Sequence, residues 1–308
     1  MSIMPSQSFN AFCPDWATAL LNGFSQIFLQ RDPLCGLLCL LAILASAPAL
    51  LGGALLGALA GLLTAQQRGY AKADRQAGLF SYNGVLLGLL LSLYLPWSIL
   101  LPPLIIAAGG LSAIITQQWL KRARQPARLP AYTAPFVGLG WLLAGLFTPL
   151  AAHPQTAGLS PTGLLGGLFQ GLGQVMFLGD WLAGLLVFAG LLLANRRAAI
   201  WALGGSGFGL AVAVMLQEPG QALSGLAGYN CALVALALGQ LGLRPWWPLL
   251  GMVLALLIAP GIAAIGLPPL TGPFVLACWL VLACNRVLGR TPRSEAPCAS
   301  ATNPPRLR

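Results

Sequence analysis

Long apolar segments, separated by short polar or basic stretches, make up most of this sequence. Several of them approach or reach the roughly 20 residues that a membrane-spanning helix needs; they are 50–65, 99–120, 131–147, 198–216 and 246–265. The stretches between them contain the proline, glycine and polar residues that are typical of loops. The pattern predicts an all-α polytopic membrane protein.

The composition agrees with this prediction. Of the 308 residues, 57% are hydrophobic and 7% are charged, whereas soluble proteins carry about 25% charged residues. The net charge of +10 comes from short clusters between apolar segments, where orientation in the bilayer explains it, so no nucleic-acid partner is expected. The scattered cysteines indicate packing rather than a metal site. Without a metal-ligand cluster, a Ser/His/Asp arrangement or a phosphate loop, we expect neither an enzyme nor a cofactor.

Three motifs occur twice in the same order. GFSQIFLQRDPLCG matches GLGQVMFLGDWLAG, YNGVLLGLLL matches YNCALVALAL, and LPAYTAPFVGLGW matches LPPLTGPFVLACW at seven of thirteen positions. We therefore expect two structural repeats, 14–148 and 163–285, joined by an extracytoplasmic linker at 149–162. An N-terminal segment, 1–13, precedes them, and a cytoplasmic tail, 286–308, follows them. We expect this tail to be disordered because it is polar and rich in proline.

The basic residues predict opposite orientations for the two repeats. In the first repeat the basic loops are QQRGYAKADRQ and KRARQPAR, whereas the counterparts in the second, QEPGQAL and APGIAAIG, contain no Lys or Arg. The positive-inside rule places basic loops in the cytoplasm. This requires an odd number of spans per repeat, most simply about five, with both termini cytoplasmic. Inverted repeats of this kind place substrate sites near the midplane where the two copies meet.

The Leu-Pro-x-x-Thr-x-Pro-Phe motif places a threonine between prolines that interrupt regular helix and free backbone carbonyls. Broken backbone at membrane depth is tolerated where protein buries it or where it lines a polar cavity. For a single copy, a proline kink with a back-bonded threonine is the simpler interpretation. Duplication on an inverted axis favours a lining role for Thr133 and Thr271, because symmetry would bring them toward one another.

Gln26 and Gln174 each precede a break in a run too short to span the bilayer, which predicts half-helices. A buried amide must be hydrogen-bonded, so each glutamine either joins helices or contacts a ligand. Farther along the chain, Tyr-x-x-x-Leu occurs in each copy with its two side chains on one helical face. These residues, which are Tyr82 with Leu86 and Tyr229 with Leu233, either pack in the core or form the walls of a narrow slot.

A slot of this kind suits a small solute. No acidic residue stands firmly in the middle of a span, so a proton relay has little to build on. Asn83 and Asn230 are expected to hold the adjoining turn or to bond neighbouring backbone. Aromatic walls, carbonyls, amides and hydroxyls favour a small, planar, uncharged polar solute, such as urea or a close amide.

Together the paired motifs resemble the urea transporter family, as a bacterial member, from about Leu20 to Cys284. The resemblance implies a homotrimer in the cell (inner) membrane, in contact with the lipid bilayer. Each protomer would have its own pore, built from two inverted halves of about five transmembrane helices plus a half-spanning helix, and would conduct urea passively. Gln26 and Gln174 would serve the two mouths, and Thr133 and Thr271 would mark the middle.

The resemblance also implies that the two Tyr/Leu pairs wall the slot, with Phe28, Leu29 and Phe177 as further wall candidates. The sequence departs from the family where Arg31-Asp32-Pro33 and Gly179-Asp180-Trp181 follow the glutamines. Two alternatives remain open. One is a channel of the same fold for another small neutral solute, such as a short amide, ammonia or water. The other is a membrane scaffold or a lipid-modifying enzyme, in which the motifs would only pack.

Overall fold

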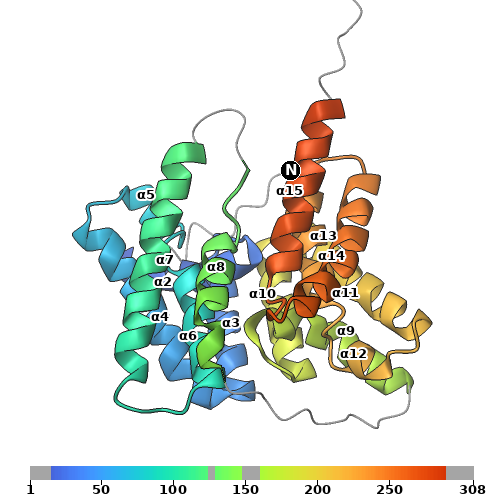
Figure 1. Cartoon of the computed structure of the whole chain (residues 1–308), viewed down its shortest axis with the longest axis horizontal. Coiled ribbons are helices and arrows are strands. Elements are labelled where there is room, and N and C mark those ends of the chain that lie inside the picture. The colour runs from blue at the N-terminus through green and yellow to red at the C-terminus, as the bar shows by residue number, and fades with distance from the viewer. Residues whose placement is uncertain (1–14, 124–128, 148–159, 289–308) are drawn as a thin grey trace, which may run out of the picture.

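The structure of the protein is a computed structural model that describes residues 15–123, 129–147 and 160–288 (Figure 1). The regular structure of these residues is entirely helical. The prediction of an all-α polytopic membrane protein is therefore confirmed. The segments 1–14, 124–128, 148–159 and 289–308, with nearly all of the expected linker and tail, lie outside the described residues.

The helices follow one another in the same order in both halves of the chain. The first half contains α2 (Asp15–Ser25), the 3-10 helix η1 (Gln26–Phe28), α3 (Pro33–Ser46), α4 (Pro48–Gln67), α5 (Lys72–Gln76), α6 (Tyr82–Tyr94), α7 (Leu101–Ala123), α8 (Ala134–Leu143) and the 3-10 helix η2 (Ala144–Leu146). The second half contains α9 (Pro161–Gly173), the 3-10 helix η3 (Gln174–Met176), α10 (Trp181–Ala194), α11 (Arg196–Met215), α12 (Pro219–Leu223), α13 (Tyr229–Gly239), α14 (Trp246–Ala264) and α15 (Gly272–Leu288). Helices thus begin at Pro161 and end at Leu288, slightly outside the expected repeat 163–285.

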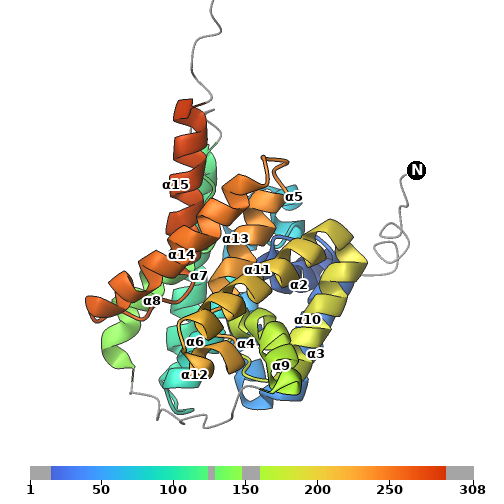
Figure 2. The same ribbon diagram turned by 90° about the vertical axis from the view of Figure 1, so that its right-hand side faces the viewer.

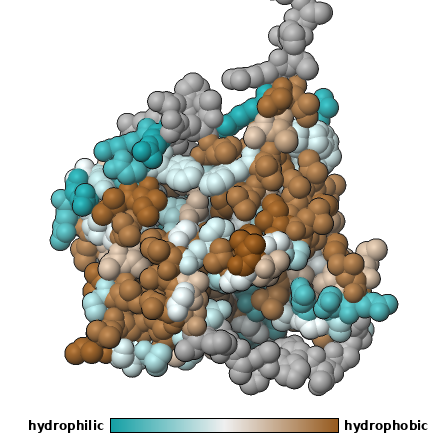
Figure 3. Space-filling model, viewed as in Figure 1, coloured by the Kyte–Doolittle hydropathy of each residue, from teal (hydrophilic) through white to brown (hydrophobic). Residues whose placement is uncertain are grey.

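Within the described residues, four helices are long and apolar enough to cross a membrane, namely α4, α7, α11 and α14. Each coincides to within two residues with, or contains, one of the apolar segments predicted to span. The count rises to six if each of two sharply bent helix pairs is one span. The fifth predicted segment, 131–147, becomes helical only from Ala134. Figure 3 shows a broad apolar surface on one face, with hydrophilic residues toward its edges. Side chains such as Ile99 (90% exposed) and Met215 (82%) therefore suit contact with lipid.

The helices α6 and α13 form the centre of the fold. Every residue from Tyr82 to Leu91 in α6 is buried, as is every residue from Asn230 to Gly239 in α13. A helix that is apolar all round is stable only when other helices enclose it, and α4 and α11 do so through close backbone contacts. A Cβ on Gly57 would lie 2.0 Å from the carbonyl oxygen of Gly84. One on Gly205 would lie 2.5 Å from that of Cys231.

These contacts predict a difference between two adjacent glycines of α11. Gly205→Ala places a methyl group against Cys231 O and within 2.7 Å of Ala235 Cβ, so we expect it to destabilise the fold by roughly 1–3 kcal/mol. Gly204→Ala meets nothing within 4 Å and should be neutral, or stabilising by up to about 1 kcal/mol. Thermal unfolding of the purified variants in detergent measures both effects. Equal unfolding midpoints would contradict the close packing of α11 on α13.

Candidate functional site

Each half of the chain begins with a helix that stops and turns sharply. The pair α2 and η1 bends by 77° into α3, and the pair α9 and η3 bends by 78° into α10. Leu29 (φ 56°) and Phe177 (φ 61°) close the two turns in the left-handed region, which residues other than glycine seldom adopt. The breaks predicted after Gln26 and Gln174 are therefore present.

The tight bends depend on glycines that let backbones touch. A Cβ on Gly36 would lie 1.9 Å from Leu21 O, and one on Gly184 would lie 1.8 Å from Phe169 O. The short first helices thus lie directly on the helices that follow them. Any side chain at these two positions would push the broken segments apart.

The residues after the turns start new helices. Asp32 Oδ1 accepts a hydrogen bond from Cys35 N at 2.8 Å, and Asp180 Oδ1 accepts one from Leu182 N at 3.2 Å. Both aspartates therefore act as N-caps, which satisfy donors that a helix start leaves unpaired. Arg31-Asp32-Pro33 and Gly179-Asp180-Trp181 share this capping role although their sequences differ.

The two glutamines occupy equivalent places, at the first residue of η1 and η3, with different partners. Gln174 Nε2 donates to Ser224 O at 2.9 Å. Gln26 Oε1 is buried and has no hydrogen-bond partner among the described residues. Because a buried unsatisfied acceptor costs about 1–3 kcal/mol, Gln26 presents an acceptor that a solute with N–H groups would satisfy.

A second pair of breaks precedes α8 and α15. Tyr132 (φ 42°) and Leu270 (φ 46°) both adopt left-handed backbone just before the motif threonines. The hydroxyl of Tyr82 donates to Tyr132 O, and the hydroxyl of Tyr229 donates to Leu270 O at 2.7 Å. The tyrosines of α6 and α13 therefore hold the carbonyls at these breaks.

The asparagines beside these tyrosines hold the same segments. Asn83 Oδ1 accepts from Phe136 N at 3.3 Å, and Asn230 Oδ1 accepts from Phe274 N at 3.2 Å. The expectation that the asparagines bond neighbouring backbone is confirmed. Their amide groups differ, because Asn230 Nδ2 donates to Leu270 O at 3.2 Å and Asn83 Nδ2 donates to Thr116 Oγ1 at 3.2 Å.

The two threonines meet where the halves of the chain touch. Thr133 Oγ1 and Thr271 Oγ1 lie 2.6 Å apart and are hydrogen-bonded, so the expectation that these residues approach one another is confirmed. Both are almost fully buried, at 2% and 3% exposure. This hydroxyl pair does not bond back to its own helices, in contrast to the simple proline-kink interpretation.

Reciprocal tryptophan bonds flank the threonine pair. Trp141 Nε1 donates to Pro268 O at 2.9 Å, and Trp279 Nε1 donates to Pro130 O at 2.8 Å. Each donor and acceptor has its equivalent in the other half, which is the pattern of a two-fold interface. The halves are thus joined by matching bonds around the two threonine hydroxyls.

The carbonyls expected to be free at the prolines are largely engaged. Pro130 O and Pro268 O accept from tryptophans, and Tyr132 O and Leu270 O accept from tyrosines. The expectation of free carbonyls is corrected to this extent, because other helices supply donors that the local sequence does not show. A carbonyl oxygen accepts two hydrogen bonds, so Pro130 O, Pro268 O and Tyr132 O have room for a second bond, whereas Leu270 O already accepts from both Tyr229 and Asn230.

The predicted wall residues differ in their exposure. Leu86, Leu233 and Phe28 are buried, at no more than 1% exposure, whereas Leu29 and Phe177 are half-buried. The two positions of left-handed backbone show that Leu29 corresponds to Phe177, in agreement with the ungapped alignment of the two glutamine motifs. In that register Phe28 corresponds to the buried Met176.

Aromatic residues that the sequence analysis did not single out lie beside these positions. The rings of Phe136 and Phe177 are edge-to-face with centroids 6.3 Å apart, and those of Tyr132 and Phe274 are tilted with centroids 5.0 Å apart. Phe136 and Phe274 are the phenylalanines of the repeated Leu-Pro-x-x-Thr-x-Pro-Phe motif. The sequence offered one signal for these residues, which is that the motif places a phenylalanine three residues after each threonine.

The arrangement brings amide, hydroxyl and carbonyl groups together among aromatic and leucine side chains. None of the side chains described in it is charged. It can therefore form hydrogen bonds with a neutral solute of either donor or acceptor type, and it offers nothing to neutralise an ion.

Comparison with known proteins places this arrangement in context. The family model described as "Urea transporter" matches residues 17–286. The chain is similar to urea transporter 1 of Ovis aries, with 28% identity over 297 residues that cover 87% of this chain and 76% of the relative. Urea transporter 1 of Mus musculus is also 28% identical, over 302 residues with the same shares covered.

Proposed function

This chain belongs to the urea transporter family, and we propose that it conducts urea passively along a narrow path where its two halves meet. Family membership supports a transporter rather than an enzyme. The path, the contact residues, the orientation and the assembly go beyond family membership and are part of the proposal.

The contact between Thr133 and Thr271 carries the proposal. Their hydroxyls meet at 2.6 Å on the reciprocal interface between the halves, and substrate sites in inverted-repeat transporters lie at such interfaces. A hydroxyl both donates and accepts, so the pair can exchange its mutual bond for bonds to the carbonyl and N–H groups of urea. We assign these threonines to the middle of the path.

The glutamines are assigned to the two mouths. The buried and unpartnered Oε1 of Gln26 offers an acceptor to an N–H group of urea, and Gln174 provides the amide at the other end. The adjoining walls are assigned to Tyr82 with Leu86, Tyr229 with Leu233, and Leu29 with Phe177. Phe28 supports the first wall from behind, since it is fully buried.

Flat walls and neutral hydrogen-bonding groups favour urea by shape and exclude ions by the cost of desolvation. Passive conduction follows from the same groups, because the assigned path contains no charged residue to couple urea to a proton or a sodium ion. The second candidate, a channel of this fold for ammonia, water or a short amide, depends on the same contacts.

We further propose that the chain resides in the cell membrane as a homotrimer with one path per protomer, and that its termini are cytoplasmic. The charges of the loops support the orientation, because basic residues concentrate on the α5 side of the first half and are absent from the corresponding α12 side of the second. The trimer is proposed on the family alone.

Stopped-flow measurements on proteoliposomes test the solute. We expect urea entry well above that of empty vesicles and independent of any ion gradient, with slower acetamide entry. Measurements of ammonia and water run in parallel. If urea entry matched empty vesicles while another solute was accelerated, the solute would be wrong. If verified folded protein moved none of them, the path itself would be wrong.

Substitution of the threonines tests their role in the path. Thr133→Val and Thr271→Val keep the shape and remove a hydroxyl, so each should lower urea flux by about fivefold, the equivalent of one hydrogen bond. Thr162→Val is the matched control, because Thr162 is exposed at the start of α9. The double variant separates two explanations. If the two hydroxyls bond only to each other, the double variant should recover urea flux relative to the single variants. If both hydroxyls contact urea, the double variant should have a lower urea flux than either single variant.

Single cysteines in equivalent loops test the inverted orientation. Ala71→Cys lies beside α5 and Gly220→Cys lies in α12, where a new Cβ would meet nothing within 4 Å. In a background with Cys13, Cys284 and Cys298 replaced by serine, an impermeant maleimide should label Ala71→Cys from the cytoplasm and Gly220→Cys from outside. Labelling of both from one side would refute the inversion.

A further inference from the structure

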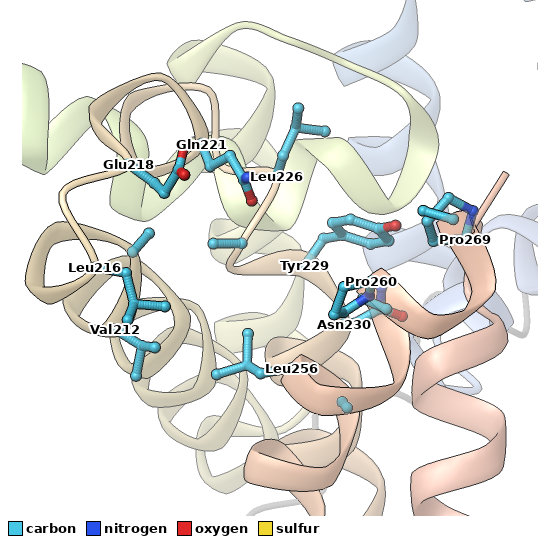
Figure 4. A pocket seen from close by; sticks show the side chains of 15 residues that line it. Val212, Leu216, Glu218, Gln221, Leu226, Tyr229, Asn230, Leu256, Pro260 and Pro269 are labelled. Atoms are coloured by element: carbon cyan, nitrogen blue, oxygen red, sulfur yellow. The ribbon is translucent and has the colours of Figure 1, made fainter.

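A cavity of about 770 Å³ lies in the second half of the chain, between α11 and α14 (Figure 4). Its walls come from the end of α11, from α12, from the start of α13 and from the second half of α14. Most of the lining side chains are alanine, leucine, valine and proline. Tyr229, which is assigned to a wall of the proposed path, also forms part of one wall of the cavity, whereas Gln174, Thr133 and Thr271 do not line it. The cavity therefore adjoins the proposed path at Tyr229 and extends away from its threonines and glutamines.

The corresponding place in the first half is filled. The ring of Phe80 is buried there, 5.1 Å from the ring of Tyr70, in a cluster with Ala65 and Ala113. In the register set by the two Tyr-Asn pairs, the counterpart of Phe80 is Ala227, which lines the cavity. The absence of an aromatic ring at Ala227 thus contributes to the volume of the cavity.

The position of α14 also opens the cavity. In the first half, Gly109 and Gly110 seat α7 against α4, since Cβ atoms on them would lie 2.8 Å from Gly57 O and 2.9 Å from Thr64 Oγ1. The helix α14 runs diagonally in the view of Figure 2, and Pro260, which lies inside this helix, lines the cavity.

The cavity is polar at one end and apolar at the other. Glu218 and Gln221 gather on the α12 side, whereas Val212 and Leu256 lie at the opposite end (Figure 4). Since the spanning helix α11 ends at Met215, the polar end lies at the level where that span ends. The apolar end extends beside two membrane-spanning helices. This polarity matches a head group followed by a hydrocarbon chain.

The charge at the polar end selects the head group. Glu218 is the sole charged residue between Arg197 and Arg244, and it forms no ion pair with any described residue. A cationic group would therefore be attracted to this end, and an anionic one repelled. The exposed neighbours are apolar, with Leu216 at 69% and Leu257 at 66% exposure, so a molecule can enter from the bilayer.

We propose that this cavity binds one acyl chain of a membrane phospholipid with an ammonium head group, of the phosphatidylethanolamine type. The ammonium lies at Glu218 and Gln221, and the chain runs between α11 and α14 toward Leu256. The lipid would contact the wall that contains Tyr229 and Asn230, and it would thereby support the segment at Leu270 that both residues hold.

Photolabelling of the unmodified protein tests the proposal without a substitution. Full-length protein in vesicles receives a phosphatidylethanolamine with a diazirine in one acyl chain, and labelled peptides are mapped by mass spectrometry. We expect label to concentrate at Val212, Leu256 and Ala259, above exposed positions such as Leu142. Phosphatidylglycerol with the same chain should label these positions less. Label spread evenly over exposed apolar positions would overturn the proposal.

Two substitutions test the binding of the acyl chain and the binding of the head group separately. Ala227→Phe reproduces the filling seen at Phe80 and should lower labelling in the cavity by at least about tenfold for both lipids, because the ring excludes several methylene groups. Ala211→Phe is its control, since it adds the same ring on an exposed position of α11. Glu218→Gln should lower phosphatidylethanolamine labelling by only about threefold and remove the preference between the lipids.

A second copy of the chain is the competing occupant. Leu256→Cys tests it, because disulfide-linked oligomers at this position would mean that the face between α11 and α14 meets another protomer. That result would overturn the lipid assignment. Urea flux is not the readout in any of these measurements, so their failure would leave the proposed function untouched.

Discussion

Backbone groups that leave a helix inside a membrane protein must find new hydrogen bonds, and this requirement governs the four breaks of the present fold. The breaks at Leu29 and Phe177 are satisfied locally, by bonds from their own N–H groups to Gln26 O and Gln174 O. The breaks at Tyr132 and Leu270 depend on tyrosine and asparagine side chains from α6 and α13. Those two segments can form only when the central helices are in place, so α6 and α13 shape the proposed path as well as the core.

The same bonds make the two halves chemically unequal. Leu270 O accepts from both Tyr229 and Asn230, which uses both of its lone pairs. The amide of Asn83 is directed to Thr116 instead, so among the described side chains only Tyr82 donates to Tyr132 O, which keeps one lone pair. A solute that carries N–H groups would thus find an open acceptor in the first half and a closed one in the second.

The sequence predicted the helical class, the four long spans, the breaks after the glutamines and the meeting of Thr133 with Thr271. Local sequence features predict these elements, because hydrophobic length, prolines and a duplicated motif can be read directly along the chain. It did not predict the bonds from Trp141 and Trp279, since a long-range donor leaves no local pattern. Residue type alone did not establish that Leu29 and Phe177 are equivalent, because the two side chains differ and the feature they share is the left-handed backbone.

Divergence between the halves is distributed as the geometry requires. Pro130, Thr133 and Trp141 have identical counterparts in Pro268, Thr271 and Trp279, and each of them bonds across the interface to the other half. At a two-fold contact, a change in one member of a pair leaves its partner without a complement. Phe80 and Ala227 never meet, because each packs only within its own half. Such positions can differ in size at little cost to the interface, which is why a cavity opens in one half while the contacts around the threonines remain matched.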